Sequence, residues 1–496
     1  MKKIILYINF SIVTFITFLY SWSLPSDWND FVIGLVDDNT MTDTLGKAID
    51  MFGIEIDYHY RYINGGIDTN TNWYSWGPTG SGSIVTTFIE NGLKYGIRPA
   101  WTIYLLQEEG GVDALLKNID NPDFMREYYR QIAWVADKSK GLKPIFVIEP
   151  DTWGYFLKAK FHDDSIKYNE ATVHAHVNDL GEGYEYLSDL PNNLQGVARG
   201  IIRTIRKYAP DAYVGFHVNT WAVWVGGLIS GIYDSDNANG LVYWDSLDIA
   251  YSAQINAKFY KSLLGDEDRG DFIVVEKYGL DAGVAGEAYY WGDKEMEKYL
   301  YWCSILSDSL DLPLLGWQIP IGHLGLPNTT DSYEDTFMPY FFNHVNDFIK
   351  VGFIGILAGQ GLPAGTDYST SPEWGDQGWL FSKLVEFDKG RPYLRALSIN
   401  KQQATFSISK NINIDIYPNP FNPQTTIYLN NLKLGGKIFV AIYDIKGKLL
   451  QRLYKGKINS KDLKLTWNGE SFSSGVYFVK VKYNGNDISK KMVLIK

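Results

Sequence analysis

Short apolar runs alternate with amphipathic segments along residues 27–396 of this 496-residue chain. Such alternation is typical of parallel β/α units, in which each strand is followed by a helix that covers the sheet. Two clear helical patterns are Phe124–Lys138 and Val197–Tyr208. The runs predicted to be strands are Phe31–Val36, Ile54–Tyr60, Arg98–Leu105, Pro144–Ile148, Tyr213–Val218, Leu247–Tyr251, Phe272–Val275 and Leu314–Ile319. This pattern predicts an α/β fold, a (β/α)₈-type barrel, and a ninth run, Gly352–Leu357, either closes a distorted barrel or lies beside it.

The last part of the chain changes to period-two alternation between turns, which predicts a small all-β sandwich over residues 411–496. Its predicted strands are Asn413–Tyr417, Thr425–Leu429, Lys437–Tyr443, Lys448–Leu453, Lys464–Trp467, Val476–Tyr483 and Asp487–Ile495. A polar linker, residues 397–410, joins it to the barrel. Charge supports this boundary, because residues 411–496 hold 14 Lys and Arg against 5 Asp and Glu, a net of +9, which leaves −20 for the rest of a chain whose total is −11.

The first 23 residues have the layout of a secretory signal peptide. Lys2 and Lys3 precede the apolar run Ile4–Tyr20, and small residues follow at Ser21 and Ser23. The alternative is an amino-terminal membrane anchor, because the run is nearly long enough to span a bilayer. The Ser-Trp-Ser end favours cleavage, and the mature protein is predicted to carry no membrane span.

Composition narrows the expected partners. The net negative charge argues against nucleic acid, because phosphate binding needs a basic face. Aromatic residues make up 15% of the chain, more than a core needs, and flat rings stack well on the apolar faces of sugars. A polysaccharide is therefore the expected substrate. The single cysteine, Cys303, is expected to be a buried thiol, no cofactor is predicted, and the chain is expected to be a monomer.

Two carboxylates follow the predicted strand that ends at Ile148. Pro150 cannot continue a central ladder, so the strand should stop there. If the extended conformation persists to that point, Glu149 and Asp151 point the same way. Two carboxylates at the carboxyl end of a parallel strand suit acid–base chemistry on a glycosidic bond. Glu149 and Asp151 are therefore the first catalytic candidates.

Polar or aromatic side chains also end most of the other predicted strands, at the rim where barrel enzymes keep their active sites. Glu276, at the end of the seventh predicted strand, is the third catalytic candidate. The predicted substrate-binding residues are Trp153, His217, Asn219, Trp221, Trp224, Asp57, Gln318 and His323. His174 and His176 have the spacing of metal ligands, but the sequence identifies no third ligand, so they are interpreted as solvated and no metal site is assigned.

Four motifs near the carboxyl end are Ile416–Pro423 (IYPNPFNP), Ile442–Gly447 (IYDIKG), Ser474–Phe478 (SGVYF) and Lys490–Lys496 (KKMVLIK). In this order they resemble the sorting domain of the type IX secretion system. The resemblance implies type IX secretion machinery as a partner and export across an outer membrane, after which the domain is removed or used for surface attachment. The expected location is therefore secreted or attached to the cell surface.

The segment Val147–Thr152 (VIEPDT) resembles the Val-Ile-Glu-Pro-Asp-Ser signature of glycoside hydrolase family 6, the inverting cellobiohydrolases and endoglucanases. Segments similar to later parts of that family follow in the same order: Gly215–Trp224, Trp291–Asp293 and Leu315–Pro320. The resemblance implies cellulase-like hydrolysis of a β-linked polysaccharide, with Asp151 in the place of the proton donor. The chain departs from the family at Tyr104–Glu109, where an Arg-Asp-Cys element is missing, and at Gln318, which replaces a Lys.

Two hydrolytic mechanisms remain open, and inversion is favoured. In the inverting one, Asp151 is the acid, and the like charge of Glu149 raises its pKa. Candidates for the base are Asp331, Glu334 and Asp335. In the retaining one, Glu149 ends strand four as acid/base and Glu276 ends strand seven as nucleophile, as in the large superfamily of retaining barrels.

A third interpretation belongs to another functional class. A non-catalytic carbohydrate-binding surface protein would keep the Trp-rich surface and the export signals without any acid–base pair. Loss of sugar release on replacing Glu149 and Asp151 together by their amides would distinguish an enzyme from such a binding protein.

Overall fold

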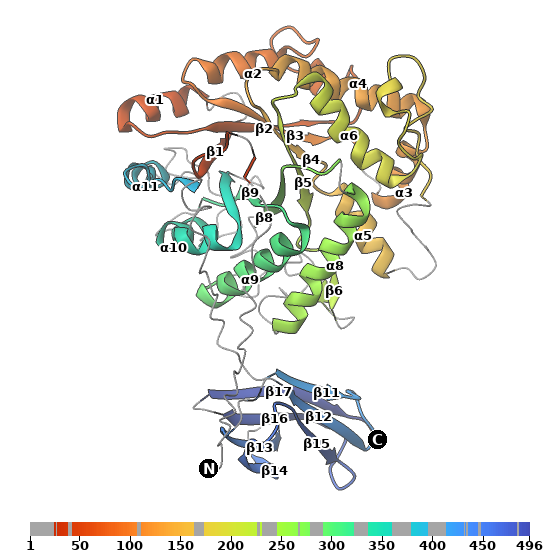
Figure 1. Ribbon diagram of the computed structural model, residues 1–496, viewed down its shortest axis with the longest axis vertical. Helices are drawn as coiled ribbons and strands as arrows, with labels where there is room; N and C mark the ends of the chain where they lie inside the picture. Colours follow the sequence, from red (N-terminus) through yellow and green to blue (C-terminus); the bar gives the residue numbers. More distant parts are fainter. Residues whose placement is uncertain are drawn as a thin grey trace, which may run out of the picture. The chain divides into compact units, whose positions relative to one another are not determined.

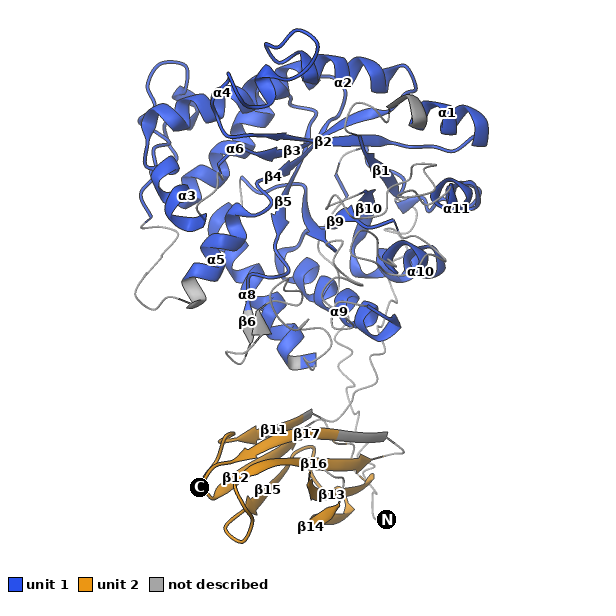
Figure 2. Ribbon diagram, turned by 180° about the vertical axis from the view of Figure 1, so that it is seen from behind, with its two compact units in different colours: residues 1–402 blue, residues 403–496 orange. Residues whose placement is uncertain are grey.

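The computed structural model describes residues 24–25, 27–37, 42–106, 111–162, 173–225, 229–230, 246–265, 268–277, 291–321, 336–359, 378–394, 413–430, 432, 435–444, 448–483 and 486–496. The chain divides into two compact units, Met1–Gln402 and Gln403–Lys496 (Figure 2). Each unit has its own buried apolar cluster. The predicted signal peptide and the predicted linker lie outside the described residues.

Parallel strands of the first unit close into an eight-stranded barrel within the described part of the chain, in the order β1-β10-β9-β8-β5-β4-β3-β2. The strands are β1 (Val32–Val36), β2 (Tyr58–Asn64), β3 (Arg98–Tyr104), β4 (Ile145–Ile148), β5 (Tyr213–Val218), β8 (Phe272–Glu276), β9 (Leu314–Ile319) and β10 (Phe353–Ala358). This topology confirms the predicted (β/α)₈-type barrel. A separate two-residue ladder, β6 (Trp224–Val225) with β7 (Ile229–Ser230), lies outside it.

Helices surround the barrel (Figure 1). They are α1 (Thr42–Phe52), α2 (Ser83–Leu93), α3 (Gly111–Ile119), α4 (Pro122–Ser139), α5 (Thr152–His162), α6 (Leu194–Tyr208), α8 (Ser246–Leu264), α9 (Asp293–Leu310), α10 (Phe337–Val351) and α11 (Trp379–Asp388). The two helical patterns of the sequence correspond to α4 and α6. Each of these helices begins after an asparagine, Asn121 or Asn193, whose side chain accepts backbone N–H groups of the first turn.

The predicted sixth strand is wrong, because Leu247–Tyr251 lies in the first turns of α8. A five-residue apolar run is too short for its period to separate a strand from a buried helix face. In the helix, Ile249 is buried whereas Tyr251 is 46% exposed. The run Gly352–Leu357 supplies the missing strand instead, because β10 pairs with both β9 and β1 and closes the barrel.

The second strand is displaced from its predicted position. The prediction was Ile54–Tyr60, whereas β2 begins at Tyr58 and continues to Asn64. Ile54 and Ile56 are buried and alternate like strand residues, but they lie in the loop between α1 and β2. The displacement moves Asp57 to the amino end of β2, away from the predicted rim.

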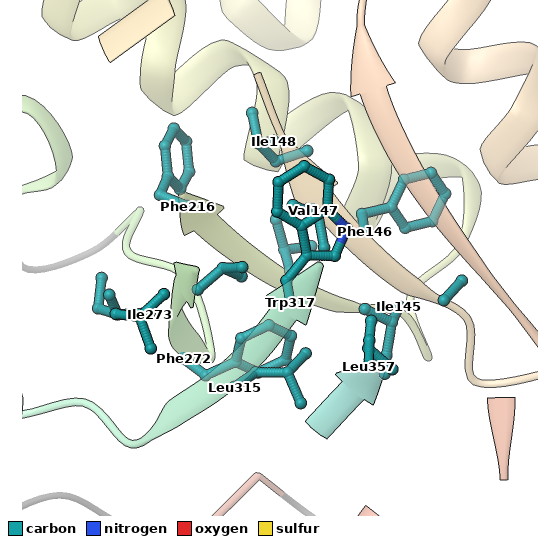
Figure 3. Close-up of a cluster of buried hydrophobic side chains, with 14 of the residues drawn as sticks. Ile145, Phe146, Val147, Ile148, Phe216, Phe272, Ile273, Leu315, Trp317 and Leu357 are labelled. Carbon is teal, nitrogen blue, oxygen red and sulfur yellow. The ribbon is translucent and has the colours of Figure 1, made fainter. Parts of the chain in front are cut away.

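Large side chains fill the barrel between its strands (Figure 3). Figure 3 shows Val147 of β4, Leu315 of β9 and Leu357 of β10 near Trp317. The Trp317 indole donates to Thr102 Oγ1 (3.1 Å), which joins β9 to β3 although these strands are not neighbours. The interior is therefore a packed core, and it supports the side chains at the carboxyl ends of the strands.

The second unit consists of two antiparallel sheets, one ordered β11-β12-β15 and the other β14-β13-β16-β17. Their strands are β11 (Asn413–Tyr417), β12 (Gln424–Asn430), β13 (Lys437–Asp444), β14 (Leu449–Lys457), β15 (Leu463–Asn468), β16 (Gly475–Tyr483) and β17 (Asn486–Leu494). Trp467 is fully buried in the apolar cluster of this unit and packs on Phe421, Phe472 and Tyr477. All seven predicted strands are therefore present, with ends shifted by at most a few residues.

Among the helices that the structure describes, none combines the length and the apolar character needed to cross a bilayer.

Candidate active site

The carboxyl ends of the barrel strands bring several polar side chains to one rim, as expected for a parallel barrel. Tyr62, Tyr104 and His217 lie in the last residues of β2, β3 and β5. Glu276 is the last residue of β8, and Asp151 lies in the turn between β4 and α5. Hydrogen bonds, ring contacts and charge interactions connect these five residues, so we describe them as the candidate site.

Glu149 and Asp151 do not share a direction. The strand β4 ends at Ile148, and Glu149 adopts a left-handed backbone conformation with φ +48°. A non-glycine residue in this region turns the chain sharply and breaks the alternation of an extended strand. The condition for a shared direction, an extended backbone through Glu149, is therefore not met, and each carboxylate has its own surroundings.

Glu149 is completely buried, and its carboxylate accepts four hydrogen bonds. Oε1 accepts from the backbone N–H groups of Leu105 (3.0 Å) and Leu106 (3.2 Å) and from Tyr128 Oη (3.1 Å). Oε2 accepts from Thr152 Oγ1 (3.2 Å). Burial raises the pKa of Glu149 to about 7, although these four donors act in the opposite direction. The side chain thus ties the turn after β3 to the start of α5, and its acceptor sites are used within the fold.

Asp151 lies partly exposed and has fewer partners. Oδ2 accepts from Tyr104 Oη (2.9 Å), and Oδ1 lies 3.5 Å from Asn219 Nδ2. Burial and the negative charge of Glu276 raise the pKa of Asp151, although His217 and the bond from Tyr104 lower it. The like charge that raises the pKa of Asp151 therefore comes from Glu276, whereas Glu149 was predicted to supply it. A raised pKa lets a carboxyl group hold a proton for donation.

His217 is fully buried, and its two ring nitrogens contact Pro150 and Glu276. Its Nδ1 donates to Pro150 O (2.6 Å), and its Nε2 lies 3.4 Å from Glu276 Oε2. Burial lowers the pKa of His217, but the charges of Glu276 and Asp151 and the bond to Pro150 outweigh burial, so the pKa is raised overall.

Aromatic and amide groups border the two carboxylates. Tyr62 packs edge-on to Tyr104, with ring centroids 6.3 Å apart, and also contacts Trp317 (5.7 Å). Gln318 Nε2 donates to Tyr62 Oη, and Gln318 has a left-handed backbone with φ +51°. Tyr62 and Tyr104 were missed as site residues. Tyr104 ends β3, and Tyr62 is in the last three residues of β2. A tyrosine at the carboxyl end of a barrel strand is the signal that would have identified both.

The other predicted site residues fall into three groups. Trp153 is fully buried, packs on Phe216 and donates to Ile148 O (3.2 Å), so its indole belongs to the core. Trp221 is partly exposed, packs on Tyr155 (5.1 Å), and lies two residues after Asn219, whose Nδ2 is 3.5 Å from Asp151 Oδ1. Trp224 is in β6, where its side chain is outside the described part of the structure, and His323 is outside the described residues altogether, as are Asp331, Glu334 and Asp335.

Asp57 is at the opposite end of the barrel from the candidate site. It precedes β2, accepts from Ile33 N (2.9 Å) and pairs with Arg391 Nη1 (2.7 Å). These contacts tie the amino ends of β1 and β2 to the segment after α11. The prediction that Asp57 binds substrate depended on the displaced strand, and the position of the residue contradicts it.

The strand count also changes the retaining interpretation. In barrel order Glu276 ends the sixth strand, because Leu247–Tyr251 is helical. The seventh strand is β9, which carries Gln318 near its end. A pair of glutamates on strands four and seven is therefore not formed by Glu149 and Glu276, and the two carboxylates that interact are Asp151 and Glu276.

Solved structures with a similar fold include the double mutant of an endo-β-1,4-mannanase from Cellulomonas fimi, with 10% identity, TM-score 0.41 and coverage of 94% of both chains. A glycoside hydrolase family 5 protein from Bacteroides vulgatus has 10% identity, TM-score 0.36 and coverage of 89% of this chain and 90% of that one. The β-1,4-mannanase of the sea hare Aplysia kurodai has 9% identity, TM-score 0.37 and coverage of 72% and 92%. Likenesses this weak assign no activity, and the barrel assignment rests on the closed sheet itself.

No curated protein matches the chain. One family matches part of it: residues 415–496 correspond to the family described as the secretion system C-terminal sorting domain. The match covers the second unit from β11 onward. It confirms the predicted sorting domain at the carboxyl end of the chain.

Proposed function

We propose that the chain is an exported glycoside hydrolase that cleaves a β-linked polysaccharide, cellulose or a related β-glucan, with Asp151 as proton donor. The observation that carries the proposal is that Asp151 and a second carboxylate, Glu276, lie at the same rim of the barrel, where His217 contacts both Pro150 O, next to Asp151, and Glu276 Oε2. Glycoside hydrolysis needs one carboxyl group that holds a proton and one that is ionised. Asp151 has the raised pKa, and Glu276 Oε2 lies 3.4 Å from His217 Nε2.

The surroundings of Asp151 support this division of roles. Tyr104 Oη holds one oxygen of the Asp151 side chain, which leaves the other oxygen facing Asn219 at a long 3.5 Å. Asn219 Oδ1 is buried without a hydrogen-bond partner among the described residues. An unsatisfied buried acceptor costs free energy unless a ligand pairs with it, and a sugar hydroxyl is a suitable donor. Asn219 is therefore proposed to bind substrate, together with Gln318 and Trp221.

Inversion of the anomeric centre remains the proposed stereochemistry, because it follows from the resemblance of Val147–Thr152 to glycoside hydrolase family 6. In this mechanism Asp151 protonates the leaving oxygen while an ionised carboxylate activates a water molecule on the other face of the sugar ring. Glu276 is the proposed second carboxylate among the described residues. Secretion is proposed through the signal peptide of residues 1–23 and the type IX machinery that reads the sorting domain.

The test combines substrate profiling with one variant. The purified protein is incubated with cellulose, mixed-linkage glucan, xylan and mannan, and NMR follows the anomer first released. We expect release from a glucan with inverted configuration, and we expect Asp151→Asn to lower kcat by about 10²–10⁴-fold while substrate binding and thermal stability persist. A retained anomer would contradict inversion. Binding of glucan without any sugar release by the unaltered protein would make it a carbohydrate-binding protein.

A further inference from the structure

A second cluster of reactive side chains uses none of the residues of the candidate active site. Asp120 directly follows α3, and His174 and His176 lie in the segment that leads towards α6. One potential ligand atom of each residue lies within 4.8 Å of those of the other two. We propose that Asp120, His174 and His176 form a binding site for a divalent transition-metal ion of the zinc type.

The donor set selects the class of metal. Two imidazole nitrogens and one carboxylate oxygen suit zinc and neighbouring transition metals, whereas Ca²⁺ and Mg²⁺ require sites made mainly of oxygen. Zinc binds such ligands at about 2.0–2.2 Å in a tetrahedral arrangement, and three protein ligands leave a fourth position for water. Asp120 and His174 are exposed, so their side chains can rotate by the small amount needed to close around an ion.

The two closest side chains already face one another. His174 Nδ1 lies 2.5 Å from Asp120 Oδ1, and the imidazole rings of His174 and His176 are 5.0 Å apart and nearly perpendicular. Donor atoms from three side chains thus converge on one place. Simple ion pairing would account for the contact between Asp120 and His174, but it requires no third ligand there.

A fourth residue, Asp179, forms a hydrogen bond with the His176 ring. His176 Nδ1 lies 2.7 Å from Asp179 Oδ2, which leaves Nε2 as the ligand atom. Histidines that bind metal ions usually donate their other ring N–H to a carboxylate or carbonyl, because this bond orients the ring and sets the tautomer. Asp179 has the position of such a supporting carboxylate, and it is itself partly exposed.

The backbone that carries both histidines is held in place independently of any ion. His176 N donates to Ile119 O (2.9 Å), one residue before Asp120. The Asn192 side chain accepts from Val177 N and Asn178 N, both at 2.9 Å, and His174 forms an isolated bridge with Asn193. The main chain therefore fixes the spacing of the ligands, and an ion would link the end of α3 to the segment before α6.

The first experiment measures binding directly. Protein without an affinity tag is stripped with EDTA and titrated with Co²⁺, and the visible d–d absorption is recorded; Zn²⁺ is then added to displace Co²⁺. We expect one equivalent of Co²⁺ to bind, Zn²⁺ to displace it, and Ca²⁺ or Mg²⁺ in excess to leave the spectrum unchanged. We also expect Zn²⁺ to raise the Tm relative to EDTA, because it binds the folded state.

Variants locate the ion. His174→Ala, His176→Ala and Asp120→Asn should each abolish the cobalt spectrum, and Asp179→Asn should weaken binding by about 10–100-fold. These side chains are exposed or half-buried, so the Tm of each variant in EDTA should equal that of the unaltered protein. The matched control is His344→Gln, since His344 lies in α10 and stacks on Tyr340. Absence of Co²⁺ binding, or equal binding by the double variant His174→Ala/His176→Ala, would overturn the proposal.

Discussion

Glu149 and Asp151 are two residues apart, yet they lie in different environments because one backbone dihedral changes sign. The left-handed φ of +48° at Glu149 directs its side chain to donors in the turn after β3, in α4 and at the start of α5. Such a conformation costs a non-glycine residue about 1–3 kcal/mol, and the four hydrogen bonds offset that cost. Glu149 therefore holds the turn that positions Asp151.

Replacement of Glu149 separates this positioning role from acid catalysis. Glu149→Gln keeps an oxygen for Leu105, Leu106 and Tyr128 and can donate to Thr152, so we expect a stable protein with sugar release close to the original. Glu149→Ala leaves buried donors unpaired, and we expect the free energy of unfolding to fall by at least about 3 kcal/mol. Urea denaturation and initial rates on the same samples check both results. If Glu149→Gln were as inactive as Asp151→Asn, Glu149 would be a catalytic residue.

The same residue predicts a pH dependence of stability. Because the pKa of Glu149 rises from an unfolded value of 4.5 to about 7 on folding, the folded state binds its proton more tightly. The stabilising contribution is complete below pH 4.5 and is lost as the pH rises through about 7, a change on the order of 3 kcal/mol. Urea denaturation between pH 4 and 8 should show this loss in the unaltered protein. The loss should be absent from Glu149→Gln, and an equal slope in both proteins would contradict the assignment.

Tyr104 is expected to set the pH at which catalysis declines. Its hydroxyl donates to Asp151 and stabilises the ionised carboxylate, so it lowers a pKa that burial and Glu276 have raised. An acid must be protonated to act, and the rate falls as the pH rises through the pKa of Asp151. In Tyr104→Phe we expect the alkaline limb of the kcat/KM profile to move to higher pH. Tyr155→Phe, which alters a neighbouring tyrosine that packs on Trp221, is the control and should leave this limb unchanged.

At the scale of single elements, β2 shows how a displaced strand changes an interpretation. The apolar alternation at Ile54 and Ile56 is indistinguishable by period from that of the strand that follows. Pairing with β1 and β3 sets the strand at Tyr58–Asn64. That register puts Tyr62 at the site and Asp57 at the amino end, where it binds Arg391.

Asp57 is therefore predicted to affect stability and not substrate binding. Asp57→Ala removes one of the two carboxylate partners of Arg391, whose side chain is only 8% exposed, and the acceptor of Ile33 N, whereas Asp388 still pairs with Arg391. We expect the free energy of unfolding to fall by about 1–3 kcal/mol, because Ile33 N loses its acceptor and Arg391 keeps only Asp388, and we expect KM to stay unchanged. The control is Asp347→Ala, which breaks the exposed pair with Lys350 and should cost under about 1 kcal/mol. A raised KM with unchanged stability would return Asp57 to the substrate site.

At the scale of the whole molecule, the two units have separate apolar clusters and different classes of fold. The first cluster belongs to residues of the barrel and its helices, and the second is centred on Trp467 between two antiparallel sheets. A separate core is what allows a domain to fold alone. Catalysis and sorting are therefore expected to be separable.

Truncation tests this separation. A chain that ends at Gln402 should fold and keep the kcat/KM of the full chain on soluble β-glucan, because every proposed catalytic residue precedes that point. In a host with a type IX system, the truncated chain should remain inside the outer membrane. Full-length Asp151→Asn is the complementary control, since it should be exported but inactive. Export of the truncated chain would contradict the role of the sorting domain.

Several features of this protein were readable from its sequence because they depend on local order. The period of apolar residues indicated seven of the eight barrel strands, and the run that became β10 was identified as able to close the barrel. Period-two alternation predicted the sandwich, and the resemblance of four motifs to the type IX sorting domain predicted its sorting role. The segment Val147–Asp151 was recognised as a strand end with carboxylates because strand, proline and acid are adjacent in the chain.

Only the tertiary structure decided which residues distant in the chain lie close together in space. The partner of Asp151 is Glu276, 125 residues later, and the third member of the proposed metal site is Asp120, 54 residues before His174. A sequence contains the types of these residues but not their separations in space, which arise from barrel closure and strand register. For the same reason the local pattern predicted that the side chains of Glu149 and Asp151 point the same way. The left-handed backbone at Glu149 instead gives the two carboxylates different directions.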